Sequence, residues 1–321
     1  MKILITGAAG FIGANLCEFM LKQGYFVVGL DNFLTGHSNN LKDFNNHPNF
    51  SFIEADICDF DSCLDASKKI DYVLHQAALG SVPRSIKDPI LSNQINVSGF
   101  LNMLEASKQN GIKRFVYAAS SSTYGDSKAL PKVEDSIGKP LSPYAITKYV
   151  NELYAEIYSS TYGIETIGLR YFNVFGRRQD PKGSYAAVVP KFVSQFLSGE
   201  SPLINGNGSF SRDFTYIDNV ILMNHLAITT TETEAVNQVY NTAVGDRVTI
   251  LEMTKLIREG LSEFVPSIKD IEIKFGPDRL GDIPHSQASI QKAKDLLNYN
   301  PSHDFKQGLE ESLTWYYNNL R

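Results

Sequence analysis

A glycine-rich turn near the N-terminus constrains the fold of this 321-residue chain more than any other feature. The turn, Gly7-Ala8-Ala9-Gly10-Phe11-Ile12-Gly13, directly follows residues 2–6, a short apolar run typical of a buried parallel strand. Residues 14–23 then show helical apolar spacing, and Gly24 is the kind of residue that ends a helix. Glycines let the backbone approach a pyrophosphate at a helix N-terminus, where free amides and the helix dipole favour negative charge. The pattern therefore predicts a phosphate-binding turn.

An acidic residue, Asp31, ends the next apolar run, at residues 25–30. At this distance from the glycines, a carboxylate can accept hydrogen bonds from the 2′- and 3′-hydroxyls of a ribose and repel a 2′-phosphate. A tight turn that needed glycine only for its own shape would leave Asp31 unexplained. We therefore predict a dinucleotide site, with NAD rather than NADP as the cofactor.

Further apolar runs follow with the period of a doubly wound sheet. Strands are expected at 49–55, 71–75, 114–119, 166–170 and 239–242, and helices at 91–109, 143–162, 184–197, 250–263 and 305–319. Residues 218–229 are expected to return the chain to the cofactor-binding domain. The predicted fold class is α/β, a doubly wound (Rossmann) parallel sheet with a smaller C-terminal α/β domain. Residues 1–172 with 217–246 are expected to bind the cofactor, and residues 173–216 with 247–321 the substrate.

Composition limits the possible partners. The net charge of -5 and the pI of about 5.7 argue against nucleic acid and against an anionic membrane. The three cysteines, Cys17, Cys58 and Cys63, have no metal-ligand spacing, so we predict free thiols in a reducing compartment and no metal. No apolar run approaches the roughly 18 residues of a spanning helix. A cytoplasmic protein is expected.

The stretch 120–148 carries the candidate chemistry. Ser120-Ser121-Ser122-Thr123-Tyr124-Gly125 follows an expected strand, and Tyr144-Ala145-Ile146-Thr147-Lys148 opens a helix, with Tyr144 and Lys148 on one face. A phenol keeps its proton up to about pH 10, and a neighbouring lysine favours the phenolate and lowers its pKa. We predict that Tyr144, Lys148, Ser120 and Ser122 are catalytic. No chemistry is expected at residues 126–143, and His75 is expected to be structural.

Two motifs identify a family resemblance. The spacing Gly-x-x-Gly-x-x-Gly, together with Tyr144 and Lys148, resembles the extended branch of the short-chain dehydrogenase/reductase superfamily. Residues 212–218, RDFTYID, resemble the Arg-Asp-Phe-x-x-Val-x-Asp motif of that branch, with Ile217 replacing the usual valine. The resemblance covers essentially the whole chain and is greatest with bacterial UDP-N-acetylglucosamine 4-epimerases, which interconvert UDP-GlcNAc and UDP-GalNAc. The segments that carry it are 77–85, 120–125, 141–144 and 170–179.

The resemblance extends the predicted NAD site. Asp56 and Ile57 would contact the adenine, and Asn96 would steady the active-site strand. The small side chains of Ala77 and Ala78 would let the chain pass close to the cofactor. The predicted cofactor-binding residues are Gly7, Gly10, Phe11, Ile12, Gly13, Asp31, Asn32, Gly36, Asp56, Ile57, Gln76, Ala77, Ala78, Asn96, Tyr144, Lys148 and Tyr171.

The resemblance also implies a UDP-sugar site. Arg212 and Arg279 would hold the diphosphate, because a guanidinium offers a planar fork to phosphate oxygens. Asp282 would contact ribose hydroxyls. Arg212 could instead form a surface salt bridge with Asp213, and from the residues alone both readings stay open. The other predicted substrate-binding residues are Ser81, Ser122, Asn173, Ala187, Val188, Lys191, Ile204, Asn205 and Ser286.

The serines bear on the reaction class. Nucleotide-sugar 4,6-dehydratases carry Thr-Asp-Glu before the Tyr-Gly dipeptide, whereas this chain has Ser121 and Ser122 at the acidic positions. A serine supplies no carboxyl group for elimination, so the resemblance implies an epimerase. Tyr144 would remove the proton of the sugar 4-hydroxyl while a hydride leaves C4 for NAD, and a 4-keto sugar would then take the hydride back on its other face.

The expected substrate is a UDP-N-acetylhexosamine. The resemblance implies that the residue just after Gly281-Asp282 lines the sugar pocket, and Ser286 at that position is small enough to leave room for a 2-acetamido group. Ser81, in a loop that resembles the N-acetyl-preferring group, could hydrogen-bond the acetamide. UDP-Glc and UDP-Gal remain further candidate substrates, and a UDP-glucose or UDP-glucuronate 4-epimerase is the nearest alternative. A 4,6-dehydratase or decarboxylase and an inactive NAD-sensing binding protein are the others. The resemblance implies a homodimer formed through the helices at 91–109 and 143–162.

Overall fold

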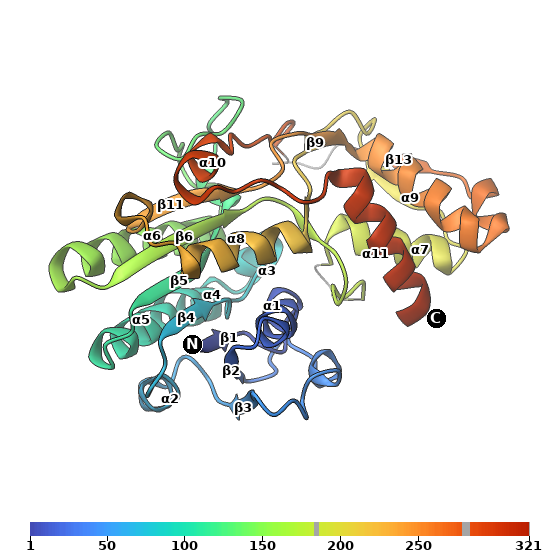
Figure 1. Ribbon diagram of the computed structural model, residues 1–321. Helices are drawn as coiled ribbons and strands as arrows, with labels where there is room; N and C mark the ends of the chain where they lie inside the picture. The colour runs from blue at the N-terminus through green and yellow to red at the C-terminus, as the bar shows by residue number, and fades with distance from the viewer. Residues whose placement is uncertain (183–185, 278–282, 321) are drawn as a thin grey trace.

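Seven parallel strands form the centre of the larger part of the molecule (Figure 1). The protein is described by a computed structural model, which covers residues 1–182, 186–277 and 283–320. The strand order is β11-β6-β5-β4-β1-β2-β3, so the chain runs outward from β1 in both directions. This arrangement confirms the predicted doubly wound sheet. The strands are β1 (Lys2–Thr6), β2 (Phe26–Asp31), β3 (Phe50–Glu54), β4 (Tyr72–His75), β5 (Arg114–Ser120), β6 (Glu165–Tyr171) and β11 (Gln238–Thr242).

Helices cover both faces of this sheet because successive strand side chains point to opposite sides. Ile3 and Ile5 belong to one buried cluster, whereas Leu4 between them belongs to another. Two helices pack on the first face, α1 (Phe11–Lys22) and α8 (Ile217–Thr229). The other face carries α2 (Phe60–Ala66), α5 (Phe100–Gln109) and α6 (Pro143–Tyr162), with the short α3 (Val82–Lys87) and α4 (Pro89–Asn93) packed against α6.

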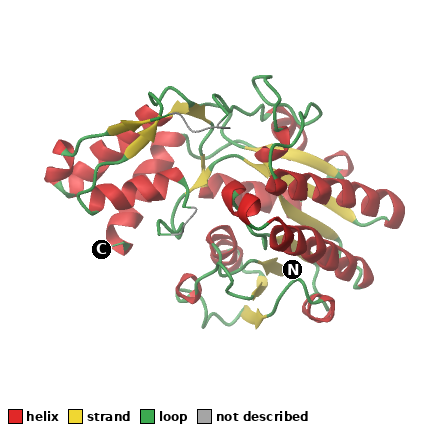
Figure 2. Cartoon of the chain, turned by 180° about the vertical axis from the view of Figure 1, so that it is seen from behind, coloured by secondary structure: helices red, strands yellow, loops and turns green. Residues whose placement is uncertain are grey.

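Three helices form the core of the smaller part, at the opposite end of the molecule in Figure 2. They are α7 (Val188–Leu197), α9 (Ile250–Phe264) and α11 (Phe305–Asn319), which contact one another. A further helix, α10 (Gln291–Leu297), packs back against β11 of the large sheet. Short strands of two or three residues pair with one another: β7 (Val174–Phe175) with β10 (Thr215–Tyr216), β9 (Ser211–Arg212) with β12 (Val248–Thr249), and β8 (Leu203–Asn205) with β13 (Lys274–Gly276).

The structure differs from the expected helices in two places. The helix expected at 91–109 is divided into α4, a π-helical segment from Gln94 to Gly99, and α5. Such wider turns often mark functional sites, and this one contains Asn96. The helix expected at 184–197 begins only at Val188, and its expected residues 184 and 185 lie outside the described ranges.

The segment 126–143 is less peripheral than expected from its charge and proline content. Lys132 and Glu134 are both buried. Lys132 pairs with Ala288 in an isolated bridge, and Glu134 accepts a hydrogen bond from the backbone nitrogen of Asn241 at 2.9 Å. These long-range contacts, which local composition does not reveal, anchor the segment to the edge of the sheet.

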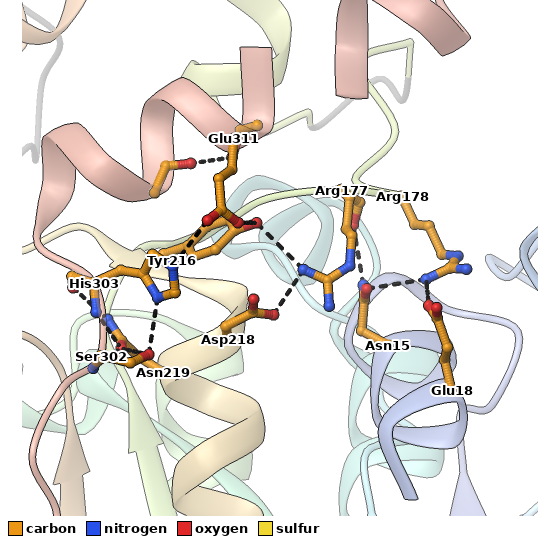
Figure 3. Close-up of polar contacts among 12 residues, drawn as sticks. Asn15, Glu18, Arg177, Arg178, Tyr216, Asp218, Asn219, Ser302, His303 and Glu311 are labelled. Atoms are coloured by element: carbon orange, nitrogen blue, oxygen red, sulfur yellow. Dashed lines mark hydrogen bonds and ion pairs between the residues drawn. The ribbon is translucent and has the colours of Figure 1, made fainter. Parts of the chain in front are cut away.

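Two adjacent arginines connect the two parts of the molecule (Figure 3). Arg178 donates a hydrogen bond to Glu18 of α1 at 2.6 Å. Arg177 points the other way and donates to the hydroxyl of Tyr216 at 3.3 Å, which in turn donates to Glu311 of α11 at 2.9 Å. The chain leaving β7 therefore holds the glycine-turn helix on one side and the C-terminal helix on the other.

The three cysteines, Cys17, Cys58 and Cys63, are free, as predicted. Among the described residues, no helix is both long enough and apolar enough to cross a membrane.

Candidate active site

A cavity of about 370 Å³ opens at the glycine turn, beside the carboxyl ends of β1, β2 and β4. Ligands of doubly wound folds bind at this edge of the sheet. The cavity brings together most of the predicted cofactor residues: Gly7, Gly10, Phe11, Ile12, Gly13, Asp31, Asn32, Asp56, Ile57, Gln76, Ala77 and Ala78.

The glycine turn is shaped for a ligand that approaches its backbone closely. A Cβ atom at Gly13 would lie 2.0 Å from the carbonyl oxygen of Gly7, and one at Gly7 would lie 2.8 Å from the nitrogen of Ala77. Gly7 also has φ of +68°, in the left-handed region that favours glycine. Gly10 then caps α1, whose first amides are free to bind an anion. These residues fit the pyrophosphate of NAD.

Asp31 holds the turn as well as lining the cavity. Its carboxylate accepts hydrogen bonds from the backbone nitrogens of Ala9 at 2.9 Å and of Phe33 at 2.8 Å. Burial raises the pKa of this carboxyl, and the backbone hydrogen bonds act in the opposite direction. Each carboxylate oxygen keeps another lone pair, so Asp31 can still accept a ribose hydroxyl.

Five predicted cofactor residues are not among the lining residues of this cavity, Tyr144 and Lys148, which are described below, and Gly36, Asn96 and Tyr171. Gly36 packs against Ala9 of the glycine turn, where an added Cβ would approach the Ala9 backbone to 2.9 Å. Asn96 is buried and bonds both the nitrogen and the oxygen of Leu79, at 2.7 Å and 3.1 Å. Tyr171 donates its hydroxyl hydrogen to Gln76 at 3.0 Å. These contacts connect Gly36, Asn96 and Tyr171 to segments that line the cavity, and their roles toward the cofactor stay predictions.

The predicted catalytic residues come from neighbouring elements. Tyr144 and Lys148 lie in the first turns of α6, where Ser142 caps the helix by accepting from the nitrogen of Ala145 at 3.1 Å. The ammonium of Lys148 donates to the backbone oxygen of Ala118 in β5 at 2.9 Å. Ser120 ends β5, so the structure brings the lysine and the serine to the same end of the sheet.

The serines form a connected pair. The hydroxyl of Ser122 donates to the hydroxyl of Ser120 at 2.9 Å, and the backbone nitrogen of Ser122 donates to the same oxygen at 3.2 Å. These contacts orient the Ser120 hydroxyl, which also makes a hydrogen bond with the Tyr144 phenol. The group can therefore exchange protons with a substrate hydroxyl held between the serine and the tyrosine.

The pKa of Tyr144 differs from the sequence-based expectation. Burial raises the pKa of this phenol, and the hydrogen bond with Ser120 only partly opposes the change. Burial also lowers the pKa of Lys148 to about 8, against the influence of Glu152, which raises it. Burial disfavours the charged form of each group, the phenolate of Tyr144 and the ammonium of Lys148. The direction of the shift is opposite to the lowering expected from Lys148, because burial is the largest influence on the phenol.

The segment that follows β4 contacts α6, the helix of Tyr144 and Lys148, through Ser85, which is not among the predicted site residues. Ser85 accepts a hydrogen bond from the backbone nitrogen of Tyr144 at 3.0 Å. Four residues earlier, Ser81 caps α3 by accepting from the nitrogen of Arg84 at 3.3 Å, with φ of +111°. The motif that contains both serines was visible in the sequence, but the long-range bond to Tyr144 was not.

His75 is structural in this geometry. It is buried, hydrogen-bonds the hydroxyl of Thr6 at 3.0 Å, and stacks on Phe115 with ring centroids 5.5 Å apart. Burial lowers the pKa of its imidazole to about 3, so the ring is neutral at physiological pH. This agrees with the prediction that it has no catalytic role.

A second cavity, of about 280 Å³, lies in the smaller part of the molecule. It brings together six of the predicted substrate residues, Asn173, Val188, Lys191, Ile204, Asn205 and Arg212. Ala187 is the N-cap of α7, directly before the lining residue Val188. Aromatic side chains that sequence reasoning missed complete the wall: Phe192, Phe210 and Phe214. The last of these lies inside the 212–218 motif, which was a signal that could have indicated it.

The residues around Arg212 are held by main-chain contacts. Arg212 donates to the backbone oxygens of Ser211 at 3.0 Å and of Pro284 at 3.2 Å. Asp213, instead of forming a surface salt bridge, is completely buried and accepts hydrogen bonds from backbone nitrogens. The backbone nitrogen of Ser286 donates a hydrogen bond to the oxygen of Ser211, and its backbone oxygen accepts one from the nitrogen of Asp213. Arg279 and Asp282, the other predicted substrate residues, lie outside the described residues.

The sequence model of the NAD dependent epimerase/dehydratase family matches residues 3–243, which is most of the chain. The matched range contains all seven strands of the large sheet, apart from the first residue of β1. The chain belongs to this family. NAD is its cofactor, and the cavity at the glycine turn has the residues to hold it.

Relatives of this epimerase-family protein match it over nearly the full length. A putative UDP-glucose 4-epimerase of Methanocaldococcus jannaschii is 36% identical over 323 residues, 99% of each chain. The structure of a UDP-N-acetylglucosamine 4-epimerase from Methanobrevibacter ruminantium M1, in complex with UDP-N-acetylmuramic acid, has a TM-score of 0.91 and 38% identity, covering 99% of this chain and 98% of that one. A UDP-glucose 4-epimerase from Thermotoga maritima, with UDP-glucose, has a TM-score of 0.92 and 34% identity, covering 100% of both chains.

Proposed function

We propose that this protein is a UDP-sugar 4-epimerase that interconverts UDP-GlcNAc and UDP-GalNAc. The observation that carries the proposal is the grouping of Tyr144, Lys148 and Ser120 at the carboxyl end of β5, next to the NAD cavity. The neighbouring Ser121 and Ser122 offer no carboxyl group for elimination, which favours epimerisation over dehydration. The epimerase names of the structural relatives support the same reaction class.

Each catalytic side chain has a defined task in this proposal. Bound NAD supplies a hydride acceptor that later returns the hydride. Tyr144, in its phenolate form, takes the proton of the sugar 4-hydroxyl and gives it back after the 4-keto sugar has turned its other face to the cofactor. Ser120, oriented by Ser122, hydrogen-bonds the same oxygen, and Lys148 favours the phenolate of Tyr144 by its charge. Proton and hydride both return to the sugar, so the overall reaction is an isomerisation.

The second cavity is the proposed site of the UDP group. Lys191 and Arg212 line it and would bind the diphosphate, because both are cationic and the guanidinium offers a planar fork. The backbone around Asn205 and the aromatic wall provided by Phe192 would hold the base. Arg279 and Asp282 remain proposed contacts to the diphosphate and the ribose.

The preference for an acetamido sugar rests on small side chains. The main chain of Ser286 is hydrogen-bonded to Ser211 of β9, and its small side chain would leave room for the 2-acetamido group of the hexose. Ser81 could donate its hydroxyl hydrogen to the acetamide oxygen. The relative that binds UDP-N-acetylmuramic acid supports an acetamido sugar, whereas the relative that binds UDP-glucose supports the alternative of a UDP-glucose 4-epimerase. UDP-glucuronate also stays an alternative.

The decisive experiment incubates the purified protein with UDP-GlcNAc, UDP-Glc or UDP-glucuronate without added NAD. We expect UDP-GalNAc to form fastest, because NAD is regenerated in each cycle and stays bound. Faster conversion of UDP-Glc or UDP-glucuronate would assign the alternative substrate. A 4-keto-6-deoxy or pentose product would show elimination or decarboxylation. Absence of turnover despite bound NAD would favour a binding protein.

We also propose the homodimer implied by the resemblance, formed through residues 91–109 and α6, with the adjoining α4 added to the interface. Large apolar side chains project from these adjacent helices, with Ile90 80% and Ile157 57% exposed. Ile146 and Leu153, at 52% and 43%, share a face of α6 with Ile157. Light scattering should give twice the chain mass for the wild type and the single mass for Ile157→Lys. A monomeric wild type would reject the proposed interface.

A further inference from the structure

Asp213 lies where the two parts of the molecule meet. It follows β9 and precedes β10, and its side chain is completely buried. Burial raises the pKa of this carboxyl to about 7, so the position is costly for a charge. A buried carboxylate that costs stability needs a structural or functional reason, and its contacts indicate one.

The carboxylate binds backbone amides from two distant segments. It accepts hydrogen bonds from Val244 at 3.1 Å and Gly245 at 3.0 Å, in the connection that leaves β11 of the large sheet. It also accepts from Ala288 at 3.2 Å, two residues after Ser286. The same acidic group therefore joins the connection from the cofactor-binding part to the loop beside the proposed hexose site.

The backbone of Asp213 reaches two proposed substrate residues. Its nitrogen donates to the oxygen of Ser286 at 2.9 Å, and its oxygen accepts from the side chain of Asn173 at 3.0 Å. Its neighbour in the chain is Arg212, which lines the second cavity. Three of the proposed substrate contacts are thus bonded to Asp213 or adjacent to it in the chain.

We infer that Asp213 is a positioning residue that holds Arg212, Asn173 and Ser286 in register with the cofactor-binding part of the molecule. This inference rests on the proposed placement of UDP in the second cavity. Asp213 does not touch that cavity, so its effect reaches the substrate only through the segments that it ties together. Loss of the carboxylate should weaken substrate binding and leave the NAD cavity intact.

The test uses Asp213→Asn, which keeps the size of the side chain but replaces one acceptor oxygen with a donor facing backbone N–H groups. We expect its dissociation constant for UDP, measured by calorimetry on the NAD-loaded protein, to rise at least tenfold. The KM for the sugar substrate should rise by the same factor, with kcat within about twofold and bound NAD unchanged. A purely structural role would lower NAD content and kcat together. Asp246→Asn, at an exposed acid directly after Gly245, is the matched control and should bind UDP normally.

Lys191→Ala separates the two possible failures. If this variant binds UDP as the wild type does, the proposed UDP site is wrong and the inference is overturned with it. If Lys191→Ala loses affinity while Asp213→Asn retains it, the UDP site stands and the role of Asp213 is rejected. Should Asp213→Asn fail to fold, Gln287→Leu removes a parallel tie, from the Gln287 side chain to the oxygen of Gly245 at 2.9 Å. A threefold or greater rise in the KM of that variant supports the inference, and an unchanged KM overturns it.

Discussion

The ammonium of Lys148 donates a hydrogen bond to the backbone oxygen of Ala118 at 2.9 Å. This contact ties the catalytic helix α6 to β5 two residues before Ser120, so the phenol-bearing and serine-bearing elements keep a fixed relation. Because the bond uses only one of the three ammonium protons, the others are available to a ligand in the adjacent site.

Replacement of Tyr144 by Phe should abolish epimerisation and leave NAD bound. The substitution removes only the hydroxyl that exchanges a proton with the substrate, while the backbone nitrogen of residue 144 keeps its bond to Ser85. Turnover is measured by separating the epimers, and NAD content by absorbance after denaturation. Activity close to that of the wild type would reject Tyr144 as the proton acceptor.

Replacement of Gly13 by Ala should remove NAD from the protein. The added Cβ would lie 2.0 Å from the oxygen of Gly7, so the turn must shift where the cofactor approaches. Gly276→Ala is a suitable control, because its Cβ would meet only Leu203, at an ordinary 3.4 Å. We expect NAD content to fall at least tenfold in Gly13→Ala and to stay at the wild-type level in the control. Full NAD content in both variants would contradict the proposed pyrophosphate site.

His75 should make the folded protein sensitive to mild acid. Burial lowers its pKa from 6.5 to about 3, so the unfolded chain binds a proton that the folded chain refuses. The stability that depends on neutral His75 is present above about pH 6.5 and is lost as the pH falls towards 3. Between pH 7 and pH 5 the loss should be about 2 kcal/mol. His75→Phe should show a smaller loss in urea unfolding over this range, and an equal loss in both proteins would disprove the assignment.

The pair of Arg170 and Glu152 should stabilise the fold far more than an exposed pair. Two nitrogens of Arg170 donate to the two carboxylate oxygens of Glu152, at 2.9 Å and 2.7 Å, with side chains only 5% and 6% exposed. Glu152→Gln would leave a buried guanidinium without its counter-charge, at a cost of about 3–5 kcal/mol. Asp65→Asn, which breaks the pair with Lys68 where both side chains are exposed, at 72% and 61%, should cost below about 1 kcal/mol. Denaturant unfolding would show whether the two losses differ as expected.

The order of the main elements followed from local patterns, and the seven strands of the large sheet agree with the expected ones to within one residue at each end. The two-residue strands, such as β9 and β12, were not predicted. The glycine turn and Asp31 could be recognised because strand, turn, helix and acid are close together in the chain. Lys191 and Arg212 were assigned to one site by family resemblance, and the structure places them around one cavity.

The remaining features depend on contacts between distant segments. Asp213 receives amides from Gly245 and from Ala288, which local periodicity cannot indicate. The direction of the Tyr144 pKa shift depends on how completely the phenol is buried, and spacing to Lys148 says nothing of that. Burial and long-range hydrogen bonding therefore decide the chemistry that the motifs only locate.

Replacement of Ser286 by Tyr should discriminate between the candidate sugars. The main chain of Ser286 pairs with Ser211 and Asp213, so a larger side chain cannot be accommodated by moving this segment away without breaking those bonds. If the side chain lines the hexose site, a phenol there competes with the 2-acetamido group, and kcat/KM for UDP-GlcNAc should fall at least tenfold more than that for UDP-Glc. Ser286→Ala is the control, because it removes the hydroxyl without adding volume and should retain activity on both. Equal losses on the two substrates in Ser286→Tyr would show that this position does not sense the acetamido group.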